Sequence, residues 1–282
     1  MKIPTAFPSP QALLKKHGFS AKKSWGQNYL TNEKVYRAIV DASVTAPSNW
    51  IVEIGAGLGT LTMRLAQRVP DGRVIAVEKE NDMLDVLKTE LEHLENVEIH
   101  PKNALHYSFS DIYKWSGQPI NVCGNLPYHI SSQILFRVLE NKEVINKGVF
   151  MLQKEMADRI VSEHGNKTYG ALSVLVQAQA KTSSVINVEP SSFTPQPRVK
   201  SKVIALEFKN TQDDLNIQHF RKLVKTSFAT RRKTILNNLK DHYPKQAVLE
   251  SLETMGVSPT RRPETISVKE FMTLSKTLSI NA

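Results

Sequence analysis

Short apolar runs alternate with amphipathic segments along most of the chain. Seven runs have the length of buried strands: Trp50–Ile54, Arg73–Glu78, Val97–Ile99, Ile120–Asn125, Gly148–Leu152, Ser184–Val188 and Lys202–Phe208. Helical segments separate the first six, which predicts a mostly parallel sheet covered by helices on both faces. The last two runs follow each other without a helix, and this predicts one antiparallel edge strand. We therefore expect an α/β fold with a seven-stranded sheet.

Strand patterns end near residue 210, and helical patterns continue to the C-terminus. Ser267-Val268-Lys269-Glu270 fits a capping box that begins a helix, and two or three helices are expected there. A short helix after Ser9 and a lid over a pocket are expected within residues 1–30. We predict two domains, residues 1–209 with the sheet and residues 210–282 with the helices.

Composition narrows the class of protein. Hydrophobic residues make up 40% of the 282 residues, and no apolar run is long enough to span a bilayer. The N-terminus lacks an apolar signal region, so a cytoplasmic protein is expected. Cys123 is the only cysteine, which excludes an intrachain disulfide and argues against a cysteine-based metal site; no metal is expected.

The charge balance favours a polyanionic partner. The chain has 37 Lys and Arg against 27 Asp and Glu, a net charge of +10. Residues 209–282 hold 13 basic and 7 acidic residues, a net charge of +6. The densest point is Arg231-Arg232-Lys233, which is either a phosphate-binding cluster or an ordinary solvated surface.

Asn125-Leu126-Pro127-Tyr128 follows the fourth predicted strand, at the sheet edge where α/β proteins bind ligands. An amide oxygen and a backbone carbonyl can both accept N–H bonds from the exocyclic amine of adenine or cytosine, which localises its lone pair. Pro127 restricts Leu126 to extended conformations, and Tyr128 can stack on the base. Alone, this tetrapeptide could also be a loop that merely ends a strand.

A Gly-rich turn follows the first predicted strand, in the run Glu53-Ile54-Gly55-Ala56-Gly57-Leu58-Gly59. Its glycines allow a ligand to approach the backbone closely, and the next helix offers free N–H groups. The G-x-G-x-G spacing departs from the dinucleotide fingerprint G-x-G-x-x-G. Glu78, at the end of the second strand, is placed to bind ribose hydroxyls, so an adenosine-containing cofactor is indicated.

Two further segments have no regular period. Residues 22–30 mix basic, aromatic and amide side chains, typical of either a linker or the wall of a ligand pocket. Residues 192–199 join the last two predicted strands, are rich in proline and are expected to expose an aromatic side chain, that of Phe193.

Together these segments resemble the ribosomal RNA adenine dimethyltransferase family of the KsgA/RsmA type. The resemblance runs from about Lys22 to Phe271. The matching motifs are Lys-Lys-Ser-Trp-Gly-Gln-Asn-Tyr-Leu (22–30), Glu-Ile-Gly-Ala-Gly-Leu-Gly-Thr-Leu-Thr (53–62), Glu78, Asn-Leu-Pro-Tyr (125–128), Met-Leu-Gln-Lys-Glu-Met-Ala-Asp-Arg (151–159), Tyr-Gly-Ala-Leu-Ser (169–173), Phe-Thr-Pro-Gln-Pro-Arg-Val (193–199) and Phe-Ala-Thr-Arg-Arg-Lys-Thr (228–234).

The resemblance implies a Rossmann-like methyltransferase domain and a helical RNA-binding domain. It implies transfer of methyl groups from S-adenosylmethionine to N6 of two adjacent adenines. These adenines lie in a hairpin loop near the 3′ end of small-subunit (16S) rRNA, and the reaction belongs to ribosome assembly. We expect a monomer whose partner is the small ribosomal subunit.

The resemblance also implies roles for individual residues. Glu78 would bind the ribose, Asn103 the cofactor's adenine amine, and Tyr128 with Phe193 would sandwich the flipped base. The target site would comprise Asn125, Leu126, Pro127, Tyr128 and Phe193. The cofactor site would comprise Gln27, Asn28, Leu30, Glu53, Gly55, Gly57, Glu78, Asn103, Ala104 and Asn125. RNA would contact Lys22, Lys23, Arg198, Arg231, Arg232 and Lys233.

Two positions depart from the family pattern: Asn103 stands where Asp is usual, and Asn28 where His is more frequent. Three other functions compete. A large-subunit rRNA adenine methyltransferase of the macrolide-resistance type shares the Gly-rich turn and the Asn-Leu-Pro-Tyr motif, whereas residues 228–234 favour the small-subunit enzyme. A non-catalytic RNA-binding assembly factor would not need Asn125, and the glycine spacing disfavours a nicotinamide dehydrogenase.

Overall fold

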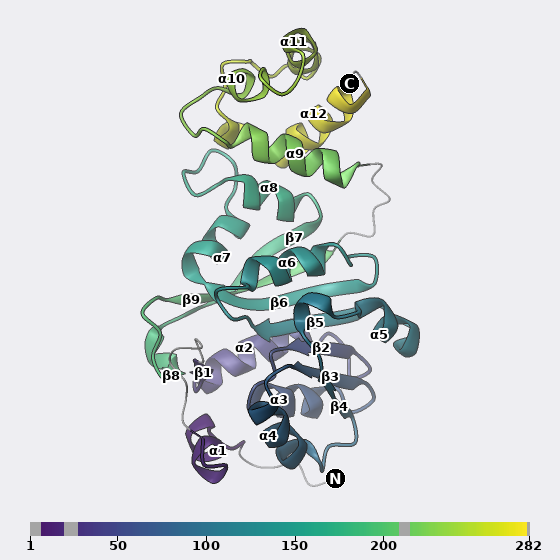
Figure 1. Ribbon diagram of the computed structural model, residues 1–282, viewed down its shortest axis with the longest axis vertical. Coiled ribbons are helices and arrows are strands. Elements are labelled where there is room, and N and C mark those ends of the chain that lie inside the picture. Colours follow the sequence, from purple (N-terminus) through teal and green to yellow (C-terminus); the bar gives the residue numbers. More distant parts are fainter. Residues whose placement is uncertain (1–6, 20–27, 209–214, 281–282) are drawn as a thin grey trace. The chain divides into compact units, whose positions relative to one another are not determined.

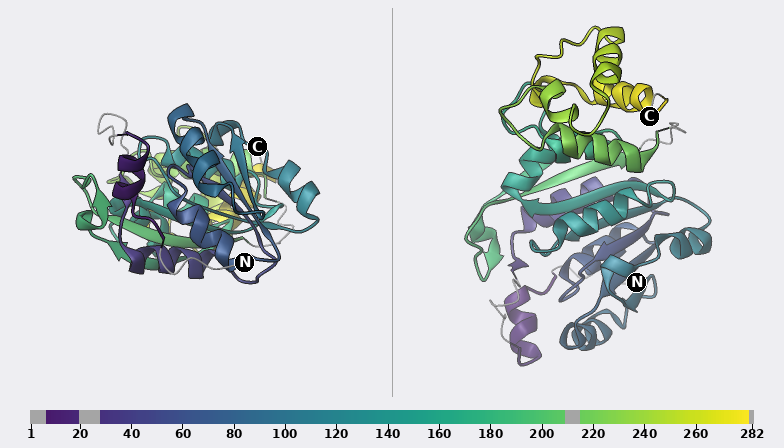
Figure 2. Two further views of the ribbon diagram at one scale, coloured as in Figure 1. Left: turned by 90° about the horizontal axis from the view of Figure 1, so that it is seen from below. Right: turned by 45° about the horizontal axis from the view of Figure 1, so that its top comes forward.

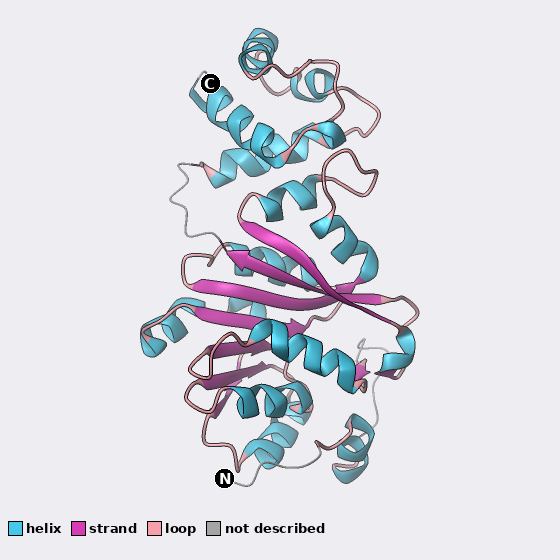
Figure 3. Ribbon diagram, turned by 180° about the vertical axis from the view of Figure 1, so that it is seen from behind, coloured by secondary structure: helices cyan, strands magenta, loops and turns pink. Residues whose placement is uncertain are grey.

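The protein is described here by a computed structural model that covers residues 7–19, 28–208 and 215–280. A seven-stranded sheet in the order β4-β3-β2-β5-β6-β9-β7 organises it (Figures 1 and 3). The five strands from β4 to β6 pair in parallel, which confirms the mostly parallel α/β sheet. Its strands are β2 (Trp50–Ile54), β3 (Arg73–Glu78), β4 (Val97–Pro101), β5 (Ile120–Asn125), β6 (Ile145–Gln153), β7 (Ala180–Val188) and β9 (Ser201–Phe208).

The antiparallel strand is β9, and it is not at the edge. It pairs antiparallel with β6 and lies between β6 and the edge strand β7, which corrects the predicted placement. The side chains explain the order. Residues 203–206 of β9 form a buried apolar run, as an internal strand requires. In strand β7, the polar residues Lys181, Thr182, Ser183 and Ser184 follow Ala180 and suit an edge.

Helices cover both faces of the sheet. Figures 1 and 3 show α2 on one face and α6 on the other. Buried side chains of α2 and α3 pack with strand residues such as Ile51 and Val149 in one core cluster. The helices before β9 are α1 (Pro10–Lys16), α2 (Glu33–Ser43), α3 (Thr60–Arg68), α4 (Asn81–Leu91), α5 (Phe109–Ser116), α6 (Ser131–Leu139), α7 (Lys154–Val161) and α8 (Ala171–Gln177), with the 3₁₀ turns η2 (Ala104–His106) and η3 (Pro190–Ser192).

A second, two-stranded sheet was not predicted. Strand β1 (Tyr29–Leu30) pairs antiparallel with β8 (Phe193–Thr194), so that Leu30 lies opposite Phe193. Phe193 is only 2% exposed and packs in the same core cluster as Leu30 and Tyr36. The expectation that the Pro-rich connection exposes this aromatic ring is therefore wrong, because β8 turns the ring into the core.

The chain divides into two compact units. The first comprises residues 1–157 and 183–209, and the second comprises residues 158–182 and 210–282. Within the described residues 215–280, the second unit has four α-helices (green to yellow in Figure 2), more than the two or three expected. They are α9 (Ile217–Ser227), α10 (Ile235–Leu239), α11 (Lys245–Thr254) and α12 (Val268–Ile280), with the 3₁₀ turn η4 (Pro263–Thr265).

Local capping signals set several helix ends. Ser9 accepts from the Ala12 amide at the start of α1. The capping box before α12 forms in both directions: the Glu270 amide donates to the Ser267 hydroxyl, and the Ser267 amide donates to the Glu270 carboxylate. Among the described residues, no helix is long and apolar enough to cross a membrane.

Candidate functional site

A cavity of about 840 Å³ lies at the carboxyl ends of β2, β3 and β5 in the first unit. This is the edge where parallel sheets bind ligands. Twelve of the residues predicted for the cofactor and target sites line it: Asn28, Leu30, Glu53, Gly55, Gly57, Glu78, Asn103, Ala104, Asn125, Leu126, Pro127 and Tyr128. Phe193 is absent from its walls, and Gln27 lies outside the described residues.

The Gly-rich turn after β2 forms one wall. Gly55 has φ +72° and Gly57 has φ +55°, backbone conformations that side-chain-bearing residues rarely adopt. The Gly55 amide donates to the Val77 carbonyl at 2.8 Å, which ties the turn to β3. Apart from its chain neighbours, no residue that the structure describes lies within 4 Å of the position a Cβ would take at Gly55, so the glycine keeps the turn open toward a ligand.

Glu78 is fixed by backbone donors at the end of β3. Its carboxylate accepts from the amides of Gly57 at 2.9 Å, Lys79 at 2.8 Å and Glu80 at 3.0 Å. A carboxylate offers about four acceptor positions, so this arrangement leaves capacity for a ligand hydroxyl. The three bonds set the orientation of Glu78 before any ligand arrives.

Glu53 lies deeper and has an unusual environment. It is 2% exposed, and Thr62 donates to its Oε2 at 2.6 Å. Burial raises the pKa of Glu53 to about 8; the Thr62 hydrogen bond opposes that shift and the charge of Glu78 adds to it. A buried carboxyl group that titrates near neutral pH in a cavity wall is typical of a functional site.

Asn125 is held in one orientation at the end of β5. Its Nδ2 donates to the backbone carbonyl of Asn28 at 3.2 Å. A carbonyl only accepts, so the amide nitrogen must face Asn28, and Oδ1 remains an acceptor to which no described residue donates. The Leu126 amide donates to the Met151 carbonyl at 3.2 Å, and no group in the described part of the chain donates to the Leu126 carbonyl. Asn125 Oδ1 and the Leu126 carbonyl are therefore two neighbouring acceptors that a ligand in the cavity can use.

Tyr128 is the aromatic residue of this turn that faces the cavity. Its hydroxyl lies 2.8 Å from the Oγ of Ser201, the first residue of β9. Burial raises the pKa of Tyr128 above its ordinary value, and the Ser201 hydrogen bond acts in the opposite direction. The phenol is therefore neutral at physiological pH.

Asn103 occupies the mouth of the cavity and is exposed. Its Oδ1 accepts from the Leu105 amide at 3.0 Å and caps η2. A carbonyl oxygen has two lone pairs, so one remains for a ligand amine. Asn103 therefore combines a structural bond with a possible ligand contact.

The predicted RNA contacts lie on different parts of the chain. Arg198 is exposed in the segment between β8 and β9, whereas Lys22 and Lys23 lie outside the described residues. Arg231, Arg232 and Lys233 form an exposed turn between α9 and α10 in the second unit. Arg231 Nη2 also donates to the Lys167 carbonyl at 2.7 Å, within the same unit.

Tyr36 and Thr60 are among the wall residues that were not predicted. Tyr36 of α2 and Thr60 of α3 line the cavity, and their hydroxyls lie 2.7 Å apart. Tyr36 also donates to the Leu30 carbonyl at 2.5 Å, which joins β1 to the Gly-rich turn. Tyr36 and Thr60 fall on ordinary amphipathic helix faces, so the sequence offers no signal for this contact.

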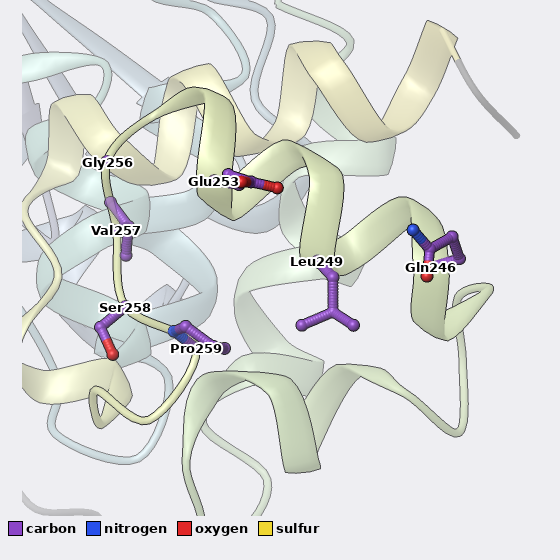
Figure 4. A pocket seen from close by; sticks show the side chains of 7 residues that line it. All are labelled: Gln246, Leu249, Glu253, Gly256, Val257, Ser258 and Pro259. Carbon is purple, nitrogen blue, oxygen red and sulfur yellow. The ribbon is translucent and has the colours of Figure 1, made fainter.

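A second hollow, of about 590 Å³, lies along α11 and the segment after it in the second unit (Figure 4). Leu249, Val257 and Pro259 supply much of its lining, with polar groups from Gln246 and Glu253. The Gly-rich turn and Asn125 belong to the other unit, so the first cavity is the candidate site. No group of three or more potential metal ligands gathers among the residues the structure describes.

Comparison of the sequence with known proteins identifies the family of this chain. The family model for ribosomal RNA adenine dimethylase matches residues 18–279. A ribosomal RNA small subunit methyltransferase A from Myxococcus xanthus is 40% identical over 276 residues, which cover 96% of this chain and 95% of that protein.

Solved structures agree on the fold. A dimethyladenosine transferase from Plasmodium falciparum superposes with a TM-score of 0.73 at 26% identity, covering 87% of this chain and 95% of that chain. The 23S rRNA methyltransferase ErmE superposes with a TM-score of 0.71 at 22% identity, covering 89% of this chain and 100% of that chain. Because a 23S rRNA methyltransferase shares this fold, the fold alone does not identify the RNA that this chain modifies.

Proposed function

Because this chain belongs to the ribosomal RNA adenine dimethylase family, we propose that it modifies two adjacent adenines in the hairpin loop near the 3′ end of small-subunit rRNA. The chain is an S-adenosylmethionine-dependent rRNA adenine dimethyltransferase. The choice of small-subunit rRNA draws support from the Myxococcus xanthus relative and from the Phe-Ala-Thr-Arg-Arg-Lys-Thr segment at 228–234.

The residues present fit S-adenosylmethionine. The open turn at Gly55 and Gly57 accommodates close approach of a ligand, and the carboxylate of Glu78 is oriented at the end of β3. In our proposal Glu78 accepts from the ribose hydroxyls and Asn103 accepts from the adenine amine. Asn28, Leu30 and Ala104 form the surrounding wall. The cofactor supplies an electrophilic methyl group on a sulfonium.

The observation that carries the proposal is the pair of acceptors at Asn125 and Leu126. Adenine N6 is a poor nucleophile because its lone pair is delocalised into the ring. If Asn125 Oδ1 and the Leu126 carbonyl accept its two N–H bonds, N6 is held toward tetrahedral geometry and its lone pair is localised. N6 held in this way would be ready to take a methyl group from the sulfonium, and for each methyl group gained it would release one proton to solvent.

Tyr128 supplies the stacking surface for the flipped adenine in this proposal. Phe193, predicted for the opposite face, is 2% exposed and packed with Leu30. To stack on a base, its ring would have to leave that core. We therefore assign base stacking to Tyr128 and assign to Phe193 the support of β1, which carries Leu30 of the cavity wall.

The second unit is proposed to position the RNA. The pocket can hold one base at a time and cannot select one hairpin among all cellular RNAs. Arg231, Arg232 and Lys233 are exposed in the most basic part of the chain, and phosphate contacts set register without reading sequence. Because the proposed substrate is a ribosomal particle, we place the enzyme in the cytoplasm. We also propose that it acts as a monomer.

Charge reversal tests the role of this turn. Arg232→Glu with Lys233→Glu should weaken binding to small subunits and flatten its salt dependence, because fewer counterions are released. Cofactor affinity should not change. Lys240→Glu with Lys245→Glu, at two exposed lysines of the same unit, is the matched double charge reversal and should have a smaller effect. If the double variant of the turn binds small subunits with the same affinity as wild type, and its affinity depends on salt concentration in the same way, then the turn is only a solvated surface.

Subunit labelling tests the substrate. Small and large ribosomal subunits from cells that lack this activity are incubated with the enzyme and methyl-labelled S-adenosylmethionine. We expect label in small-subunit rRNA as N6,N6-dimethyladenine. Label in the large subunit would instead assign the chain to the macrolide-resistance type of activity, and no label in either would favour a non-catalytic assembly factor.

A further inference from the structure

Tyr128 and Ser201 are joined through their hydroxyl groups across 73 residues of sequence. The two oxygens lie 2.8 Å apart. Ser201 is fully buried, with 0% of its surface exposed, whereas Tyr128 is partly buried and faces the cavity. The hydroxyl end of the Tyr128 side chain is therefore hydrogen-bonded to a residue in the interior of the protein.

Ser201 is a rigid attachment point. It begins β9 and pairs with Gln153 of β6, in a ladder that continues through seven residue pairs. The Lys154 amide donates to the Lys200 carbonyl at 2.9 Å immediately before it. The serine hydroxyl is thus held by the regular part of the sheet.

Tyr128, in contrast, lies in the irregular turn between β5 and α6. Its backbone carbonyl accepts from the Ser131 hydroxyl at 3.0 Å, and the Ile130 amide donates to the Pro127 carbonyl at 3.1 Å. These bonds shape the turn but leave the two side-chain torsions of Tyr128 unset. The bond to Ser201 fixes the position of the hydroxyl end of the ring, and it favours one ring plane because a phenolic O–H bond prefers to lie in the plane of its ring.

We infer that Ser201 is a positioning residue for methyl transfer, which holds the Tyr128 ring in the plane that receives the target adenine. This inference rests on the proposed function, in which Tyr128 stacks on that base. A ring already held in its working orientation loses little conformational freedom when the base arrives. It also sets the direction in which N6 approaches Asn125 and Leu126.

A merely structural role for the same bond makes a different prediction. If the bond only provides the buried Ser201 hydroxyl with a hydrogen-bond partner, its loss should lower the stability of the protein and have no separate effect on kcat. Removing one partner leaves the other unsatisfied, whereas removing both is less damaging to stability. Stability and catalysis can therefore be separated by combining the two substitutions.

The experiment compares wild type with Tyr128→Phe, Ser201→Ala and the double variant. Melting temperature, cofactor affinity, and kcat and KM for small subunits are measured for each. We expect kcat to fall about 3- to 10-fold in both single variants, as for loss of one neutral hydrogen bond, with cofactor affinity unchanged. In the double variant the melting temperature should recover above that of Tyr128→Phe, while kcat stays as low as in the single variants.

Ser173→Ala is the matched control, since Ser173 is also 0% exposed but bonds to the Arg159 carbonyl in the second unit. It should leave kcat unchanged. Single variants with wild-type kcat would overturn the inference, as would a kcat that recovers with melting temperature in the double variant. If wild type itself gives no dimethyladenine in small subunits, the proposed function fails, and that result is distinguishable from failure of the role given to Ser201.

Discussion

Replacing Glu53 by Gln should change how the stability of the first unit depends on pH. Glu53 is 2% exposed, and burial raises its pKa to about 8 from an ordinary value of 4.5. Between these two values the folded protein keeps the proton, whereas the unfolded chain releases it. The folded state then binds more protons than the unfolded state, so the free energy of unfolding falls as pH rises.

The size of the effect follows from the shift. Each unit of pH between 4.5 and 8 lowers the free energy of unfolding by about 1.4 kcal/mol. Over the whole interval the loss is roughly 5 kcal/mol, a large share of the stability of an ordinary domain. Gln has a similar shape and can still accept from Thr62, but it does not titrate. The Glu53→Gln variant should therefore lack this loss.

Urea unfolding at pH 5, 6, 7, 8 and 9 provides the assay. Tryptophan fluorescence reports on the first unit, where Trp50 and Trp115 lie. The free energy of unfolding of Glu53→Gln minus that of wild type should grow by about 1.4 kcal/mol per pH unit up to pH 8 and then level off. The same substitution at the exposed Glu143 controls for loss of one carboxyl group. A difference that stays constant from pH 5 to 9 would refute the reasoning.

Three other predictions concern the cavity. Binding of cationic S-adenosylmethionine should favour the ionised form of Glu53, which then releases its proton. Calorimetric titrations near pH 7, in buffers of different ionisation enthalpy, should show release of up to about one proton per cofactor bound. The Glu53→Gln variant should show no such release. Asn103→Asp should bind the cofactor at least as tightly as wild type does, because a charged acceptor makes the stronger hydrogen bond and because Asp also caps η2 well. Clearly weaker binding by this variant in a titration would mean that the site is built around the amide. Tyr128→Ala should weaken engagement of the target adenine by roughly 1–3 kcal/mol, and an unchanged kcat/KM for small subunits would contradict a stacking role.

The central strands could be predicted because their signals are local. Trp50–Ile54 and Arg73–Glu78 match β2 and β3 residue for residue. Each contains an uninterrupted apolar run, Trp50–Val52 in the first and Val74–Val77 in the second, as a strand buried on both faces requires. Gly55, Glu78 and Asn125 could be predicted for the same reason, since they lie at or directly after the ends of β2, β3 and β5, which parallel topology brings to one edge.

The rest depends on contacts between distant segments. Pairing of β1 with β8 joins Leu30 to Phe193 through two strands of two residues each, too short to produce a periodic pattern. The same pairing buries Phe193, so its burial was missed as well. The contact between Tyr128 and Ser201 follows from the register of β9 on β6, which no local pattern in either segment specifies.

Asn125→Ala tests the central claim most directly. Asn125 supplies one of the two acceptors for the target amine, so its loss should slow methyl transfer roughly 100-fold or more, as when one hydrogen-bonding group that acts in the transition state is removed. Small subunits that lack the modification are incubated with each enzyme, and their rRNA is examined by mass spectrometry over time. The account predicts two adjacent N6,N6-dimethyladenines with wild type and almost none with a folded Asn125→Ala that still binds the subunit. Dimethylation by that variant at a rate near wild type would contradict it.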